Sequence, residues 1–348
     1  MDFRKTLIAM AIFFVGNCVV AFAQTDIAGV TPPGSGKVFT ADERGNSISV
    51  INPDTGDVET TNIPISPHNV QTSRDGQSLF AVGSPAGEGH DMAAGMASQG
   101  RLLVFDATAV SRGPTADIEV GREPAHVIVD QQGTRAFVTN AGDNTLSVVD
   151  ISGRQVLKSI AIGNSPHGLR MSPDSRTIYV ANTGDGTVSV VNVGDLTEMA
   201  RIAVGKAPVQ VAFTPDGRHS YVTLRDENIT AVIDTVSRQV IAKIPVGLGP
   251  IQVFAAPNGR EIYVANQGTE AAPGNTVSVI DTASQKVVAE IVTGEGAHGV
   301  VVSGSGDRVF IANSFADTVS VIDPSSRKVV RSIPVGAGPG GITFAAAE

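Results

Sequence analysis

Apolar and polar residues alternate along most of the chain in short stretches that end at Gly, Asn, Asp or Pro. One unit shows the order: VQVAF (209–213) is followed by the turn TPDG, and the next stretch ends in YVTL (221–224). Relatives of NTVSVID (275–281) and KVVRSIPVG (328–336) supply the third and fourth stretches. A period of two indicates β-strands, and the Gly and Asn residues between them are typical of tight turns. Each unit therefore predicts four short antiparallel strands joined as a meander.

The unit repeats at a nearly constant spacing. Its first strand starts at a proline, or once at an alanine, and these starting residues are Pro67, Pro124, Pro166, Pro208, Pro250, Ala297 and Pro339. Successive starts are 42 residues apart, except for separations of 57 and 47 where segments are inserted. A four-stranded unit of this length cannot bury both apolar faces alone, so such repeats are typical of propeller blades.

The two ends of the repeat complete one another. Residues 338–344 supply a first strand with nothing after it, and residues 37–66 supply three later strands with nothing before them. Pairing the C-terminal strand with these three closes a seventh blade and leaves no open edge in the ring. The sequence thus predicts an all-β, seven-bladed propeller of four-stranded antiparallel blades over residues 37–348.

The strings FVTN (137–140) and YVAN (179–182 and 263–266), together with NTVSVID, resemble the YVTN family of secreted β-propellers. The resemblance covers nearly all of residues 37–348 and implies the same fold. It does not select a function, because that family includes unassigned binding proteins and resembles propeller domains of redox enzymes.

The N-terminus has the features of a secretory signal. A basic pair precedes an apolar run, and Ala21–Phe22–Ala23 forms a small-x-small cleavage site. We therefore expect a signal peptide over residues 1–23, a linker over 24–36, and a periplasmic or secreted monomer with no membrane span in the mature chain. The one cysteine, Cys18, lies inside the signal, so the mature chain has no disulfides.

Charge and motifs exclude several classes of function. The formal net charge of −9 disfavours a nucleic acid partner, because a phosphate backbone would be repelled. The chain has no phosphate-binding loop, no C-x-x-C-H haem attachment and no G-x-S-x-G or H-E-x-x-H motif. We expect neither a nucleotide nor a covalent haem as cofactor.

Histidines recur directly after the strand starts. The two positions that follow each start carry four imidazoles and three amides: His68, His126, His167 and His298, with Asn69, Gln210 and Gln252. Since the loops leading into the innermost strands of a propeller lie on one face, these side chains are predicted to surround the mouth of the central channel. Imidazole ligands suit copper or zinc.

The longer insertion belongs to the same predicted face, because it joins the second and third strands of its blade. It carries His90, Met92 and Met96. Imidazole with thioether suits copper, so these residues complete the candidate metal site, which we expect to hold Cu or Zn.

Three alternatives stay open. The first is a merely solvated polar mouth, because His126 stands one place later than the other histidines and successive strand residues face opposite ways. The second is a lactonase- or lyase-type enzyme that uses the same mouth, with His298 and Glu295 or His126 and Glu123 as acid–base pair.

The third alternative is a flat interaction platform, for example an accessory of a periplasmic redox system. The leading interpretation is a periplasmic binding protein rather than an enzyme. Its partner would be a metal ion, an unidentified small molecule or a periplasmic protein.

Overall fold

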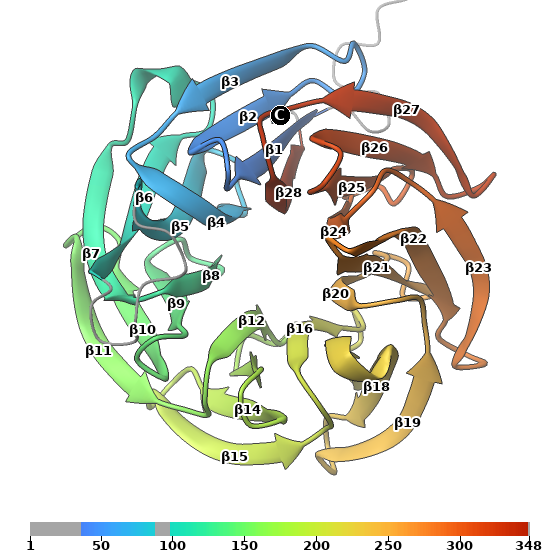
Figure 1. Cartoon of the computed structure of the whole chain (residues 1–348). Helices are drawn as coiled ribbons and strands as arrows, with labels where there is room; N and C mark the ends of the chain where they lie inside the picture. The colour runs from blue at the N-terminus through green and yellow to red at the C-terminus, as the bar shows by residue number, and fades with distance from the viewer. Residues whose placement is uncertain (1–35, 88–97, 347–348) are drawn as a thin grey trace, which may run out of the picture. The chain divides into compact units, whose positions relative to one another are not determined.

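Seven four-stranded antiparallel sheets are arranged in a ring around a central axis (Figure 1). The computed structural model describes residues 36–87 and 98–346. The predicted all-β, seven-bladed propeller is confirmed. Within the described residues, no helix is long and apolar enough to cross a membrane.

Each blade consists of four strands that follow one another from the innermost strand outward. Blade 1 contains β28 (Pro339–Ala346), β1 (Gly36–Asp42), β2 (Ser47–Ile51) and β3 (Val58–Asn62). Blade 2 contains β4 (Ile65–Thr72), β5 (Ser78–Pro85), β6 (Gln99–Asp106) and β7 (Ala116–Arg122). Blade 3 contains β8 (Pro124–Val129), β9 (Arg135–Asn140), β10 (Thr145–Asp150) and β11 (Gln155–Ala161). Blade 4 contains β12 (Pro166–Met171), β13 (Thr177–Asn182), β14 (Thr187–Asn192) and β15 (Thr197–Ala203).

The remaining blades follow the same plan. Blade 5 contains β16 (Pro208–Phe213), β17 (His219–Leu224), β18 (Ile229–Asp234) and β19 (Gln239–Pro245). Blade 6 contains β20 (Pro250–Ala255), β21 (Glu261–Thr269), β22 (Ala272–Asp281) and β23 (Lys286–Val292). Blade 7 contains β24 (Ala297–Val302), β25 (Val309–Asn313), β26 (Thr318–Asp323) and β27 (Lys328–Pro334). Two 3-10 turns, η1 (Val110–Arg112) and η2 (Arg225–Glu227), lie in connections.

Burial falls from the middle of each blade toward its rim. The second and third strands, such as β13 and β14, are almost wholly buried because a neighbouring blade covers each of their faces. The outermost strands, such as β15, alternate between exposed and partly buried residues. The core therefore consists of apolar layers between blades, and these layers fix the position of every innermost strand.

The chain ends close the ring. Strand β28 pairs antiparallel with β1, with Val38 opposite Phe344, and the Phe344 ring stacks on Phe310 of blade 7 at a centroid distance of 5.7 Å. The predicted closure of the ring by the C-terminal strand, which completes blade 1, is confirmed.

A buried asparagine lies at or near the end of the second strand in four of the described blades. The Nδ2 group of Asn182 donates to the hydroxyls of Thr187 and Ser189 on the third strand, and Asn140, Asn266 and Asn313 make the matching pairs of bonds. Blade 1 has Asp42 at this place, where the carboxylate accepts from Thr40, Ser47 and Ser49. Burial raises the pKa of Asp42 to about 6.

Candidate functional site

A β-bulge at the start of each innermost strand aims the histidines. In β8, Pro124 pairs with Asn140 and Val127 with Val138, so the bulged strand has one extra residue. The same shift occurs at the start of β12. Because a bulge interrupts the alternation of side chains, His126 reaches the channel although it stands one place later than His167. The objection that strand alternation raises against convergence is thereby removed.

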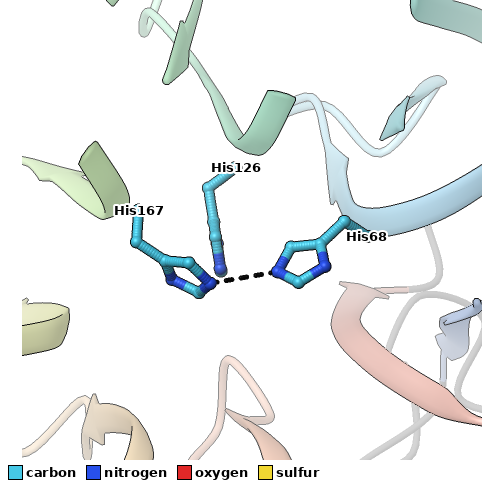
Figure 2. A group of neighbouring side chains, drawn as sticks. All are labelled: His68, His126 and His167. Atoms are coloured by element: carbon cyan, nitrogen blue, oxygen red, sulfur yellow. Dashed lines mark hydrogen bonds between the residues drawn. The ribbon is translucent and has the colours of Figure 1, made fainter. Parts of the chain in front are cut away.

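Three imidazoles meet at this end of the channel. His68 of β4, His126 of β8 and His167 of β12 each offer a nitrogen, and these nitrogens all lie within 4.8 Å of one another. Figure 2 shows the three rings pointing toward a common point from three consecutive blades. The Nε2 atoms of His68 and His167 are 3.1 Å apart.

The outer ring nitrogens of this pair face oxygen atoms. His68 Nδ1 lies 3.0 Å from Glu43 Oε1, and His167 Nδ1 lies 3.2 Å from the backbone oxygen of Val209. A carboxylate and a carbonyl can only accept, so both Nδ1 atoms donate. When both rings are neutral, their Nε2 lone pairs face each other, and the contact requires a shared proton or a cation.

Burial keeps His126 and His167 neutral at physiological pH. Removal from water lowers the pKa of His167 to about 3, and it holds the pKa of His126, which is 3% exposed, well below its usual range. The neighbouring imidazoles add to both shifts. Neutral imidazole is the form that binds a metal ion.

His126 is held from behind by Gln210. Gln210 Nε2 lies 3.4 Å from His126 Nδ1, while Gln210 Oε1 accepts the backbone N–H of Val211. This amide orientation makes Nδ1 the acceptor, and it leaves a hydrogen on the buried His126 Nε2, which has no hydrogen-bond partner among the described residues. Coordination through Nε2 therefore requires the ring proton to move to Nδ1 and the amide to turn. The Nε2 atoms of His68 and His167 thus already face each other, whereas His126 Nε2 carries a proton.

Gly168 makes room for this amide. A Cβ at position 168 would lie 2.4 Å from both Gln210 Oε1 and the Val209 oxygen. The glycine that follows His167 thus permits the contact between Gln210 and His126.

The other sequence candidates have separate positions. His298 of β24 lies outside the three-histidine group and places its Nδ1 3.1 Å from the Gly340 oxygen. Burial lowers its pKa to about 4. Asn69 accepts the backbone N–H of Val127 through Oδ1, and the buried Gln252 leaves its Nε2 without a partner in the described part of the chain.

The remaining sequence candidates belong to the longer insertion. His90, Met92 and Met96 lie outside the described residues.

The carboxylate beside the cluster is not one that the sequence indicated. His126 contacts Gln210 rather than Glu123, and His298 bonds Gly340 rather than Glu295. Glu43 instead approaches His68 from the loop between β1 and β2 of blade 1. This loop joins the second and third strands of its blade, and the topology puts such loops on the histidine face. That position in the repeat is the sequence signal that could have identified Glu43.

Comparison with known proteins assigns the family. The model of the family described as "Lactonase, 7-bladed beta-propeller" matches residues 67–240, half of the chain. The chain belongs to this family. The matched segment includes His68, His126 and His167 but not His298. No curated protein matches the chain, and the YVTN resemblance of the repeats stays a prediction.

Solved structures share the architecture at low sequence identity. The chain is similar to a functionally unknown protein from Desulfotomaculum acetoxidans (TM-score 0.74, 16% identity, covering 90% of this chain and 100% of that chain). It is also similar to a putative 6-phosphogluconolactonase from Bacteroides fragilis (TM-score 0.69, 15% identity, 91% and 99% covered). A third similar structure is Kuenenia stuttgartiensis hydrazine synthase (TM-score 0.67, 22% identity, 82% and 97% covered). At these identities the likeness supports the fold alone.

Proposed function

We propose that this propeller binds one divalent transition-metal ion, Zn²⁺ or Cu²⁺, through His68 and His167, with His126 as third ligand. The observation that carries the proposal is the 3.1 Å contact between two Nε2 atoms whose Nδ1 atoms both face oxygen acceptors. Two nitrogens bound tetrahedrally to one Zn²⁺ at 2.0–2.1 Å are roughly 3.3–3.4 Å apart. The separation therefore fits two ligands of one ion.

Glu43 supports this role. A histidine that binds a metal usually donates its other N–H to a carboxylate or a carbonyl, which fixes the ring and raises its basicity. His68 and His167 have one acceptor of each kind. The imidazole donor set suits zinc and copper, and the expected periplasmic location would bring the chain into contact with both.

Metal titration tests the proposal. The purified protein is stripped with a chelator and titrated with Zn²⁺ against a chromophoric competitor, beside the variants His167→Ala and His219→Ala. His219 starts β17 at the opposite end of its blade and serves as the matched control. We expect one ion per chain for the wild type and for His219→Ala, and at least 100-fold weaker binding for His167→Ala. Equal affinity in all three proteins would refute the site, and circular dichroism checks that each variant folds.

Family membership favours lactone hydrolysis as a second candidate function. His68, His126 and His167 would hold the ion, which would supply Lewis-acid activation of the lactone carbonyl. In the overall reaction, water oxygen adds to the lactone carbonyl carbon, the ring C–O bond breaks, and a water proton passes to the released alkoxide. His298, whose Nδ1 donates to Gly340, keeps its Nε2 lone pair and can accept that proton.

A panel of γ- and δ-lactones, followed by base uptake at constant pH, tests this candidate. We expect turnover by the Zn²⁺-loaded protein and by His219→Ala, and loss of turnover in His167→Ala and in the stripped protein. Full metal binding without turnover would leave the binding function and remove the hydrolase.

A further inference from the structure

A cavity lies at the end of the channel opposite the histidine cluster. Its volume is about 460 Å³, and residues near the C-terminal ends of six innermost strands line it, whereas the histidines lie near the N-terminal ends of such strands. The two ends are linked along β12, because His167 stands near its start and Arg170 near its end. The lining includes Arg170 and Gln71 together with the rings of Phe213, Phe254 and Phe344.

Arg170 is the one charged residue at its level of the channel. Counting from each strand start, the fifth residues are Gln71, Ile128, Arg170, Ala212, Phe254, Val301 and Thr343. The guanidinium of Arg170 lies over the Phe254 ring, with 5.3 Å between its carbon and the ring centroid, and its Nη1 donates to Gln71 Oε1 at 3.4 Å. The aromatic face and the amide hold the guanidinium in place.

The cavity is cationic within an acidic protein. Its lining contains Arg170 and the exposed Arg74 but neither Asp nor Glu, and no described carboxylate lies within 4.0 Å of the Arg170 guanidinium. Burial lowers the pKa of Arg170 to about 10, so the group keeps its charge at neutral pH. A half-buried guanidinium offers five N–H donors, and leaving most of them without an anion is unfavourable.

We propose that this cavity binds a small organic carboxylate with a flat apolar body, with the carboxylate on Arg170 and the body among the three phenylalanine rings. A guanidinium matches a carboxylate through two parallel hydrogen bonds. Phe213, Phe254 and Phe344 supply the apolar walls, and the volume falls within the usual range for small-molecule sites, about 300–1,000 Å³. This site is distinct from the histidine cluster and does not depend on metal binding there.

Calorimetry with two probes tests the proposal. The probes are biphenyl-4-carboxylate and biphenyl-4-carboxamide, which share a shape and differ in charge. We expect the wild type to bind the carboxylate at least tenfold more tightly than the amide. Arg170→Met should abolish this preference, because it keeps the apolar stem and removes the fork of donors. Arg170→Lys should retain part of the preference, since it keeps the charge without the fork.

Two control variants distinguish binding in this cavity from binding elsewhere on the protein. Arg176→Met removes an exposed guanidinium from the turn after β12 and should leave both affinities unchanged within twofold. His167→Ala should do the same, whereas a carboxylate bound to a metal ion at the histidine cluster would be lost in that variant. Equal binding of the two probes by the wild type, or an unchanged preference in a folded Arg170→Met protein, would overturn the proposal, as would the absence of binding at millimolar probe.

Discussion

The hydrogen bond between Glu43 and His68 offers a sensitive test of the proposed metal site. The substitution Glu43→Gln keeps the shape of the side chain and an oxygen acceptor but removes its charge. In the wild type, Glu43 Oε1 lies 3.0 Å from His68 Nδ1, and the two side chains are 26% and 20% exposed. The pair is thus partly shielded from water, and its loss should affect the affinity of His68 for an ion.

The expected size of the effect follows from this geometry. Removing the acceptor behind a metal-bound histidine lowers metal affinity about 10–100-fold. Since Glu43→Gln retains a neutral acceptor and the pair has some access to solvent, we expect the lower end, about tenfold, or about 1.4 kcal/mol. Glu43→Ala removes the acceptor altogether and should approach 100-fold.

The assay is competitive titration of the stripped protein with Zn²⁺ at pH 7. Glu123→Gln is the matched control, because Glu123 lines the same small cavity as His68 and His167 but, within the described residues, makes no ion pair with them. A general loss of negative charge at the mouth would weaken both variants equally. If Glu43→Gln binds Zn²⁺ as tightly as the wild type, or if the two variants weaken alike, the proposed role of the hydrogen bond is wrong.

Three further predictions concern the stability of the propeller. Burial raises the pKa of Asp42 to about 6, so the folded protein holds this proton more tightly than the unfolded chain, and stability falls by about 2–3 kcal/mol as pH rises from 4 to above 6. Asp42→Asn should remove that dependence in urea unfolding at pH 4 and pH 8, and an unchanged difference would contradict it. Gly168→Ala should lower stability by about 1–3 kcal/mol through its clash with Gln210. Gly304→Ala, with no described atom within 4 Å of the added carbon, should change stability little. Equal unfolding midpoints of the two variants would refute the packing argument. Deleting Pro339–Glu348 removes β28, and we expect loss of cooperative thermal unfolding, so an unchanged melting curve would contradict the closure.

The fold could be predicted because the same short pattern recurs at a fixed spacing. A repeated strand start identifies equivalent positions without any knowledge of contacts, and His68 and His167 occupy the same place in their units. That equivalence sufficed to bring them to one end of the channel. The closing blade also followed from the sequence, since only the C-terminal strand can complete β1–β3.

The details of the site depend on features that the alternation of apolar and polar residues does not show. Strict alternation argues against His126, and the bulge at the start of β8 aims its ring inward. Glu43 comes from a loop in another blade, so its approach to His68 depends on how blades 1 and 2 pack. The ring protons follow from oxygen partners such as Val209, which belongs to the next blade. Arg170 had a sequence signal, a charge in an otherwise uncharged layer, that becomes visible only when the layer is known.

The pairing of β28 with β1 has a consequence for biosynthesis. Strands β1–β3 leave the ribosome before the other strands, yet their partner β28 follows all of them in the chain. Until then β1 has an unsatisfied edge, and every other blade can form before the first one does. A nascent chain that stops before β28 is therefore an open arc with a free edge at β1, and a cell gains a complete disc only once β28 has been made.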